Sequence, residues 1–398
     1  MAAIGVVFAR PATAQVDLEI TRLDGGTLRG KLVEVAPQLV VQAGDGEVVL
    51  AWSEILGARV LAAQSAATTR DSGAVDPAQI DFPLRFELSD GSQFAARIER
   101  ASESDLMLQI AGGASCRVEL ARVQSIRPKS IDETAARKLA ALAIVPIEQQ
   151  DTVVVARGAE VIPLQGLVRR IDDRQVTLFW KEREVSPTWD RIAAIVFARR
   201  TERGASSVVR LQNGDSLAGK IASGDLHALT LRSPVFDDLR IAWDQVERIE
   251  CRSERVVPLS SLPLANYDFE PFFDKQWATS LDKSLFDKPI SLAGKTYARG
   301  VCQHSRSAAT FRLGGGYSQF AVTVGISDDV APRGDAAVRI VGDGRVLWRA
   351  DSIRGDRPPQ DVAVDVTGVS ELTLITDFGA DLDLADHVCW GFARLIRS

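Results

Sequence analysis

The sequence predicts an all-β protein in which repeated small β-barrel-like units precede a β-sandwich. Three observations predict this fold class. Short runs of alternating apolar and polar residues recur along the chain. Asp-Gly and Asn-Gly dipeptides separate many of these runs, and such dipeptides supply the positive φ values that tight hairpins need. One pattern also repeats across the first two-thirds of the chain, which indicates a structural unit used several times.

The composition sets the number of domains and the class of partner. A chain of 398 residues is longer than one hydrophobic core supports, so we expect three or more domains. Hydrophobic residues make up 46% and charged residues 25%, as in folded globular proteins. The net charge of −6 and the absence of clustered Lys and Arg argue against nucleic acid as a partner. No apolar run reaches the ~18–20 residues that a membrane span needs.

Residues 1–14 have features of a short or truncated signal peptide. Residues 2–9 are mostly apolar, and Ala12-Thr13-Ala14 before Gln15 has the small-x-small form of a signal-peptidase site. The usual positively charged segment is missing, so a misassigned start and an ordinary N-terminal tail are the alternatives. We expect export, with the protein secreted, periplasmic or held at the cell envelope.

The first repeat, residues 16–62, defines the repeated pattern. An Asp24-Gly25 turn precedes an alternating strand, and a closing strand begins near Trp52. Residues 205–252 repeat it most clearly, with Asn213-Gly214 and Trp243 at the matching positions. We expect each unit to be a small curled sheet, vaguely SH3-like or Sm-like, whose Trp caps the core.

Two further copies and a helix lie between these repeats. Residues 82–128 keep the Asp90-Gly91 turn but lack the Trp, and residues 151–199 are a weaker copy that retains Trp189. A capping box at Ser130 predicts a connecting helix within residues 129–146. Small barrels host many functions, so the repeats indicate only a scaffold or the binding of protein partners.

The pattern changes after residue 252. Pro258, Ser260, Ser261 and Pro263 suggest a linker, and an aromatic segment that includes Trp277 opens a new domain. From residue 262 to 397, strand-like runs alternate with Gly and Asp turns, which predicts a β-sandwich.

Several fragments of this domain occur in a distinctive order and spacing. They are Gly300-Val301-Cys302-Gln303-His304-Ser305, then Gly342-Asp343-Gly344, and finally Asp386-His387 before Trp390. In the order and spacing of these fragments, the segment resembles the NPCBM family of carbohydrate-binding modules. His304, Asp386 and Trp390 lie at motif positions of that family. The resemblance implies a galactose-binding-like jelly-roll fold and glycan binding without catalysis.

Sugar recognition needs aromatic faces for stacking and polar groups for the hydroxyls. The candidate ligand-binding residues on expected loops of this domain are Asp328, Asp329, Arg333, Trp348, Phe378 and His387. The alternative is that Trp348 and Trp390 belong to the core and that the aspartates are turn residues.

Four aspartates near the end of the domain suggest a Ca²⁺ site, because hard cations prefer oxygen-rich loops. They are Asp377, Asp381, Asp383 and Asp386. A solvated acidic loop is the alternative, since the spacing is not that of an EF-hand.

Cys302 and Cys389 form a mirror-image pattern with His304 and His387. Residues i and i+2 of a strand share a face, so antiparallel pairing in register would place Cys opposite Cys and His opposite His. This pattern suggests a cross-strand disulfide; a Zn²⁺ site and ordinary buried thiols are the alternatives.

The sequence lacks the signatures of common enzymes, including G-x-S-x-G, H-E-x-x-H and the Walker A motif. We therefore expect a non-catalytic, exported carbohydrate-binding protein. The alternatives are a structural protein of the cell envelope that binds protein partners, an accessory part of a glycoside hydrolase system, and an enzyme with an unrecognised carboxylate pair.

Overall fold

The computed structural model describes residues 15–64, 83–110, 114–129, 133–141, 150–158, 160–198, 207–272 and 275–397. In these residues the expected all-β class is confirmed, and α1 (Glu133–Ala141) is the single α-helix. The predicted signal peptide and both ends of the predicted connecting helix lie outside them. No helix in the described ranges is long and apolar enough to cross a bilayer.

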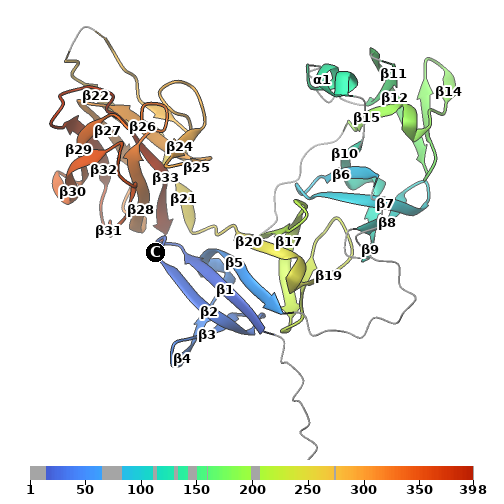
Figure 1. Cartoon of the computed structure of the whole chain (residues 1–398), viewed down its shortest axis with the longest axis horizontal. Helices are drawn as coiled ribbons and strands as arrows, with labels where there is room; N and C mark the ends of the chain where they lie inside the picture. Colours follow the sequence, from blue (N-terminus) through green and yellow to red (C-terminus); the bar gives the residue numbers. More distant parts are fainter. Residues whose placement is uncertain are drawn as a thin grey trace, which may run out of the picture. The chain divides into compact units, whose positions relative to one another are not determined.

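The chain folds into two compact units (Figure 1). The first contains Met1–Ile20 and Leu28–Arg252, and thus nearly all of the four repeats. The second contains Ser253–Ser398 together with the turn Thr21–Thr27.

Each repeat is a five-stranded antiparallel barrel in which four strands form a meander and the fifth returns to pair with the first. Repeat 1 contains β1 (Gln15–Arg22), β2 (Thr27–Glu34), β3 (Leu39–Ala43), β4 (Gly46–Leu50) and β5 (Ile55–Gln64). Repeat 2 contains β6 (Leu84–Leu88), β7 (Gln93–Ala101), β8 (Asp105–Ile110), β9 (Ser115–Glu119) and β10 (Val123–Pro128). Repeat 3 contains β11 (Asp151–Arg157), β12 (Glu160–Ile171), β13 (Val176–Trp180), β14 (Arg183–Val185) and β15 (Ile192–Val196). Repeat 4 contains β16 (Ser207–Leu211), β17 (Ser216–Gly224), β18 (Ala228–Arg232), β19 (Leu239–Ala242) and β20 (Val246–Cys251).

In repeats 1, 3 and 4, the Trp of the repeat pattern opens a short 3₁₀ turn before the closing strand. Its indole N–H donates to a backbone carbonyl near the end of the second strand, which satisfies the polar atom of a ring that is buried in repeat 4 and half-buried in repeats 1 and 3. The donor–acceptor pairs are Trp52 to Val35 at 2.9 Å, Trp189 to Asp172 at 2.9 Å, and Trp243 to Asp225 at 2.8 Å. Leu120 takes this position in repeat 2 and is buried.

Closing strands join the repeats in pairs. β5 pairs antiparallel with β20, centred on Ala58 and Ile249, and β10 pairs antiparallel with β15, where Ile126 lies opposite Ile195. Each of these four residues lies three positions after the first residue of its strand, so both contacts have local two-fold symmetry. Gly57 is required in the first pair, because a Cβ there would lie 2.2 Å from the carbonyl oxygen of Ile249.

Repeats 2 and 4 meet through the starts of their second strands. Gln93 pairs with Ser216, and the surrounding hydrogen bonds are reciprocal. The Ala95 amide donates to Asp215 (3.1 Å) and the Ala218 amide donates to Ser92 (2.8 Å). The repeats are therefore connected in the order 1, 4, 2, 3, which differs from their order in the sequence (Figure 1).

The second unit is a sandwich of two antiparallel sheets, as predicted. The first sheet contains β23 (Ser280–Leu281), β26 (Gly300–His304), β33 (His387–Arg397), β28 (Tyr317–Ile326) and β31 (Gln360–Asp365) in that order. The second contains β22 (Leu264–Phe269), β27 (Ser307–Arg312), β32 (Glu371–Phe378), β29 (Asp335–Gly342) and β30 (Arg345–Arg354). Side chains such as Phe311, Phe320 and Trp390 fill the space between them.

Two smaller elements complete the sandwich. The hairpin of β24 (Ile290–Leu292) and β25 (Lys295–Tyr297) packs against the Cys302–Cys389 region. β21 (Val256–Pro258) pairs with β33, and Leu259 after it is buried. The segment from Pro258 to Pro263, which the sequence suggested as a linker, therefore belongs to the sandwich. The sandwich starts before the expected residue 262. Burial of the apolar Leu259 side chain fixes this segment in the fold, although its composition is typical of a loop.

Candidate functional site

Several loops of the sandwich gather at one end, which we call the loop end. β26 and β28 finish there and β33 begins there, as the pairing of Ile326 with Val388 requires. β32 also finishes there, where Phe378 pairs with Ala336 at the start of β29. The loop end comprises the described residues within 270–279, 283–289, 327–334 and 379–386.

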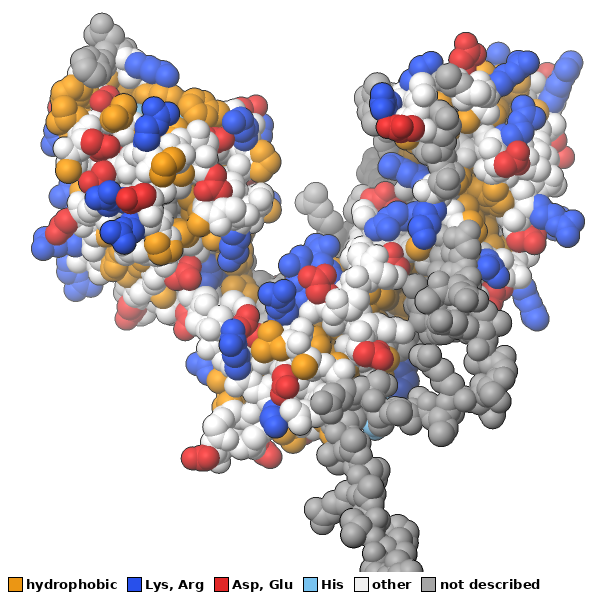
Figure 2. Space-filling model, in the orientation of Figure 1, with side chains coloured by type: hydrophobic (Ala, Val, Ile, Leu, Met, Phe, Trp, Pro, Cys, Tyr) orange, Lys and Arg blue, Asp and Glu red, His pale blue; other side chains and the backbone are white. Residues whose placement is uncertain are grey.

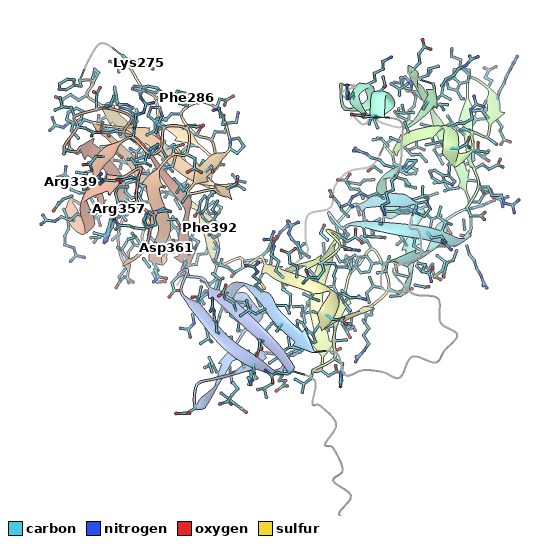
Figure 3. The ribbon with its side chains drawn as sticks, viewed as in Figure 1. Lys275, Phe286, Arg339, Arg357, Asp361 and Phe392 are labelled. Carbon is cyan, nitrogen blue, oxygen red and sulfur yellow. A yellow bond between two sulfur atoms is a disulfide. The ribbon has the colours of Figure 1, made fainter. Side chains whose placement is uncertain are left out.

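Exposed apolar side chains concentrate at this end. Among the described residues of the second unit, six large hydrophobic side chains are exposed, and four of them lie at the loop end. These four are Phe272, Phe286, Leu382 and Leu384. Figure 2 shows hydrophobic side chains along the upper edge of this unit, where Figure 3 labels Phe286 and Lys275. Grouped apolar surface of this kind is typical of interaction sites.

The paired ends of β26 and β33 place two histidines at the base of the loop end. The strands pair so that Cys302 lies opposite Cys389 and His304 opposite His387. The two cysteines are joined by a disulfide, which leaves no thiolate to bind zinc. Both histidines are 5% exposed, and their ring centroids lie 5.3 Å apart.

Aromatic residues surround the histidine pair. The Trp277 ring stacks on His304 with centroids 5.0 Å apart and meets His387 edge-on at 4.9 Å. The Lys275 ammonium lies 3.7 Å from the centre of the Trp277 ring. Phe286 contacts His387 at 4.9 Å yet is 47% exposed. Phe286 is therefore the ring of this cluster with the most area available for a ligand.

Burial keeps both histidines neutral. It lowers the pKa of His387 to about 4, with further lowering from His304 and Lys275, whereas Asp329 acts in the opposite direction. Burial also lowers the pKa of His304. The Nδ1 of His304 lies 2.6 Å from the Ser305 carbonyl, which can only accept, so this nitrogen carries the proton.

His387 has an unsatisfied polar atom. Its Nδ1 is buried and has no hydrogen-bond partner. An unpaired buried polar group costs about 1–3 kcal/mol, so this nitrogen is a local cost to stability beneath the exposed Phe286 ring.

Asp386 is a buried residue that bonds to the segment next to His304. Its carboxylate accepts hydrogen bonds from the Ser305 hydroxyl (2.6 Å) and the Asp335 amide (3.2 Å). Burial raises the pKa of Asp386 to about 7. A raised carboxyl pKa is typical of general acids, but Asp386 is fully buried and cannot touch a substrate. It holds the turn after His304 in place.

Asp328 and Asp329, two of the predicted ligand-binding residues, hold loops in place through hydrogen bonds and an ion pair. Asp328 accepts hydrogen bonds from the amides of Ala293 (2.7 Å) and Gly294 (2.9 Å) in the β24–β25 turn. Asp329 pairs with Lys288 at 3.0 Å. Their carboxylates are thus committed to loop geometry, which matches the interpretation of them as turn residues.

The other predicted ligand residues are spread over the unit. Arg333 is exposed at the loop end, and Phe378 lies there edge-on to Phe272 at 5.6 Å. Trp348 sits within β30, away from this end, and packs against the core. The motif residue Trp390 is fully buried and donates to Gln303 at 2.9 Å.

The four aspartates considered for Ca²⁺ do not converge. Asp377 pairs with Arg339 at 3.1 Å and with Arg306 at 3.6 Å, and Asp386 is engaged as described above. Asp381 is exposed and Asp383 is half-buried. In the described part of the chain, no three His, Cys, Asp or Glu side chains are close enough to hold a metal ion.

Sequence reasoning missed three residues of the cluster, namely Lys275, Trp277 and Phe286. Trp277 was noted only as part of the aromatic segment that opens the domain. Phe286 is an isolated aromatic residue in a polar stretch, which resembles any surface position. Aromatic residues between the start of the domain and the first motif were the available signal.

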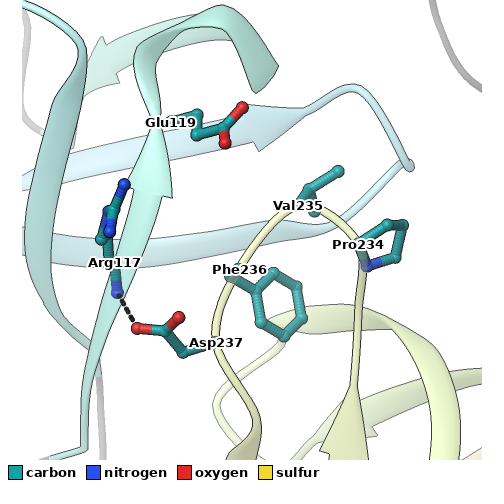
Figure 4. A pocket seen from close by; sticks show the side chains of 6 residues that line it. All are labelled: Arg117, Glu119, Pro234, Val235, Phe236 and Asp237. Atoms are coloured by element: carbon teal, nitrogen blue, oxygen red, sulfur yellow. Dashed lines mark hydrogen bonds between the residues drawn. The ribbon is translucent and has the colours of Figure 1, made fainter.

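A pocket in the first unit is a weaker candidate (Figure 4). It has a volume of about 200 Å³ and is lined by Arg117 and Glu119 of β9 and by residues 234–237 of repeat 4. The Arg117 amide donates to Asp237 at 3.3 Å and its guanidinium pairs with Asp105 at 2.8 Å. Its volume is below the range of about 300–1,000 Å³ usual for ligand sites, and its charged groups are paired.

Comparison with known proteins confirms the predicted resemblance for one part of the chain. Residues 256–396 match the NPCBM/NEW2 domain family. A Renibacterium salmoninarum protein, whose name is that of an endo-alpha-N-acetylgalactosaminidase, is 29% identical over 86 residues, which is 22% of this chain and 6% of that protein. The chain therefore spans a small part of the curated relative it matches.

Two solved structures resemble the chain in part. The CBM51 of a Clostridium perfringens GH95 protein, solved with methyl-galactose, is 24% identical, covers 35% of this chain and 99% of its own, and has a TM-score of 0.32. The CBM51-2 and INT domains of Clostridium perfringens ZmpB, solved with GlcNAc, are 20% identical, cover 48% of this chain and 40% of their own, and have a TM-score of 0.34.

Proposed function

We propose that this chain, whose residues 256–396 form an NPCBM/NEW2 domain, is an exported, non-catalytic protein that binds a glycan at the loop end of its sandwich. The observation that carries the proposal is the exposed Phe286 ring, which lies at the loop end against His387 and Trp277. The ring offers an apolar face on which a sugar ring can stack, one of the contacts that sugar recognition uses.

The charge state of the site favours a neutral ligand. Both histidines have lowered pKa values, so they are uncharged near pH 7 and add no charge beneath the exposed ring. The Lys288 ammonium, 5.8 Å from the centre of the Phe286 ring, is paired with Asp329, and the Lys275 ammonium lies over the Trp277 ring. We therefore expect binding to depend little on ionic strength.

The absence of catalysis is supported by how the carboxylates are used. Asp386, the carboxyl with the most strongly raised pKa, is buried behind the histidines. Asp328, Asp329 and Asp377 are held by hydrogen bonds or ion pairs. None of these side chains is placed as one of two carboxyls facing a common space, as glycoside hydrolysis requires.

Export is supported by the disulfide between Cys302 and Cys389, because such bonds persist in oxidising compartments. If the predicted signal peptide is cleaved, mass spectrometry of protein recovered outside the cytoplasm of a bacterial host should find Gln15 at its N-terminus. An intact N-terminus, or protein confined to the cytoplasm, would contradict this part of the proposal.

The glycan proposal is tested by applying the full chain to a glycan array and titrating the best ligand against two variants. Phe286→Ala should weaken binding about tenfold or more, because the ring supplies the stacking face. Val346→Ala is the matched control, since Val346 is 50% exposed but lies on β30, away from the loop end. Equal affinity of the two variants, or no binding to any glycan by the folded chain, would refute the proposal.

A further inference from the structure

The turn between the first and second strands contains the same side-chain hydrogen bond in three repeats. The side chain of the residue before the turn glycine accepts a hydrogen bond from the backbone amide two positions later, as Asp and Asn commonly do in turns. The donor–acceptor pairs are Gly26 to Asp24 at 2.8 Å, Ser92 to Asp90 at 2.9 Å, and Asp215 to Asn213 at 3.0 Å. Repeats 1 and 2 therefore use Asp as the acceptor, whereas repeat 4 uses Asn.

The residue that donates this hydrogen bond explains the difference. It is uncharged in repeats 1 and 2, where it is Gly26 and Ser92, but it is Asp215 in repeat 4. The Asp215 carboxylate accepts a second hydrogen bond, from the side-chain amide of Asn213 at 2.8 Å. An Asp at position 213 would place two carboxylates at this distance, which disfavours ionisation of both. The neutral, donating side chain of Asn213 is therefore matched to Asp215.

Asp215 contributes to the contact between repeats 2 and 4. Its side chain is 2% exposed, and its Oδ1 accepts the Ala95 amide of repeat 2 at 3.1 Å. The Arg85 guanidinium of repeat 2 lies 3.6 Å from the same oxygen. Burial raises the pKa of Asp215, and the hydrogen bond from Asn213 is the strongest of the contacts that oppose this rise. Loss of that donor would therefore disfavour the charged form of a group that holds the two repeats together.

Asn213 is also the asparagine of this chain best suited to spontaneous deamidation. It precedes Gly214, which has no side chain to hinder attack by its backbone nitrogen, and residues 212–214 are exposed. In this reaction the Gly214 nitrogen bonds to Cγ of Asn213, and the Cγ–Nδ2 bond breaks as ammonia leaves with the proton of the Gly214 amide. Water then opens the resulting succinimide to aspartate or isoaspartate. Asn266, the only other asparagine, precedes the bulky Tyr267.

The folded turn limits the rate of this reaction. The Gly214 amide donates to the Leu211 carbonyl at 3.0 Å, so its nitrogen can attack only when this hydrogen bond is open. The turn lies at the exposed tip between β16 and β17, and such tips open locally without unfolding the rest of the domain. We therefore expect deamidation of the folded chain to be slower than that of a free peptide, yet measurable.

We propose that Asn213 is a spontaneous deamidation site and that its conversion to an acid loosens the contact between repeats 2 and 4. The new carboxylate would lie beside Asp215 and would replace a hydrogen-bond donor by a like charge. The hydrogen bonds that Ala95 and Ala218 donate across the contact would then open more often. The contact between repeats 2 and 3 does not include this turn and would not change. The proposal is independent of glycan binding.

The test begins by incubating the full chain at mildly alkaline pH and measuring its tryptic peptides by mass spectrometry. Peptide 211–220 should show the mass gain of amide-to-acid conversion, whereas the peptide that contains Asn266 should not. In the deamidated fraction, hydrogen–deuterium exchange at Ala95 and Ala218 should be about tenfold faster or more. Exchange in the contact between repeats 2 and 3, around Ile126 and Ile195, is the control and should not change.

Two variants separate the effect of the charge from that of the reaction. Asn213→Asp supplies the carboxylate directly and should speed exchange at Ala95 without incubation. The double variant Asn213→Asp, Asp215→Asn interchanges the two groups, so one carboxylate and one amide again face each other, and exchange at Ala95 should return toward the wild-type rate.

Three results would overturn the proposal. The first is an unmodified Asn213 in the folded chain under conditions that deamidate the free peptide 211–220. The second is wild-type exchange at Ala95 in Asn213→Asp. The third is exchange in the double variant that stays as fast as in Asn213→Asp, since the effect would then not arise from two facing carboxylates.

Discussion

The repeats and the sandwich use aromatic residues in contrasting ways. In the repeats, Trp52, Trp189 and Trp243 each donate to a backbone carbonyl of their own barrel and leave no unpaired indole nitrogen. At the loop end of the sandwich, Phe286 is half exposed and the Nδ1 of His387 has no partner. Aromatic residues with completed contacts serve stability, whereas the exposed Phe286 ring leaves a face open for the ligand that we propose.

The largest expected effect concerns the Trp of repeat 4. Trp243→Ala removes a fully buried ring and its hydrogen bond to Asp225, so the free energy of unfolding of the first unit should fall by about 3–5 kcal/mol. Differential scanning calorimetry should show this loss in one transition and leave the sandwich transition in place. A uniform loss in both transitions would show that the units do not melt independently.

Removal of the disulfide should have the next largest effect on stability, and this effect should be confined to the sandwich. Replacing Cys302 and Cys389 by Ala frees a loop that spans 87 positions, so the sandwich should lose about 2–4 kcal/mol. Reduction of the wild-type chain should have the same effect, while the transition of the repeats, whose Cys116 and Cys251 are free thiols, should not move. Insensitivity of the sandwich to reductant would contradict the assigned role of the bond.

The titrations of Asp386 and His387 should have opposite effects on the stability of the sandwich as pH changes. Asp386, with a pKa of about 7 when folded and 3.8 as its usual value, lowers stability as pH rises from about 4 to 7. His387, with a folded pKa of about 4 against 6.5, raises stability between about pH 4 and 6.5. The two slopes largely cancel in the wild-type chain.

Asp386→Asn should therefore reveal the contribution of the two histidines, whose pKa values are both lowered by burial. In this variant the free energy of unfolding of the sandwich should rise by roughly 1 kcal/mol per pH unit between pH 4 and 6.5, measured by denaturant titration. The wild-type chain serves as the comparison and should stay nearly flat over the same range. A flat profile in the variant would mean that His387 does not titrate as inferred.

The smallest effect distinguishes ring burial from hydrogen bonding. Trp52→Phe keeps an aromatic ring but removes the donor to Val35, which should cost about 1 kcal/mol in the first unit. Leu120→Phe in repeat 2 is an informative control, because that position never had the hydrogen bond. A loss after Trp52→Phe as large as that expected for Trp243→Ala would mean that ring shape, and not the donor, sets the stability.

Much of the fold could be predicted from the sequence because it rests on local signals. The Asp-Gly and Asn-Gly turns and the recurring Trp identify the repeat, and alternation of apolar residues identifies its strands. The pairing of repeats was not predictable, since β5 and β20 carry ordinary strand sequences and only Gly57 hints at a close neighbour. Which edges meet depends on contacts between distant segments, which periodicity does not encode.

The candidate site was predicted less well than the fold. Its two histidines were identified because Cys302, His304, His387 and Cys389 form a pattern whose register could be inferred from strand periodicity. The roles of Asp328 and Asp329 depend on amides of the β24–β25 turn, which no local pattern links to them. Phe286 reaches His387 through loop geometry, so its place in the site appears only in three dimensions.

The pairing of repeat 1 with repeat 4 has a consequence for synthesis on the ribosome. Ile249, the partner of Ala58, is made 191 residues after it. At about 5–20 residues per second, the closing strand of repeat 1 waits roughly 10–40 s for that partner. Repeats 2 and 3 can join meanwhile, so the first repeat to be translated is among the last to be completed, with an open strand edge during the interval.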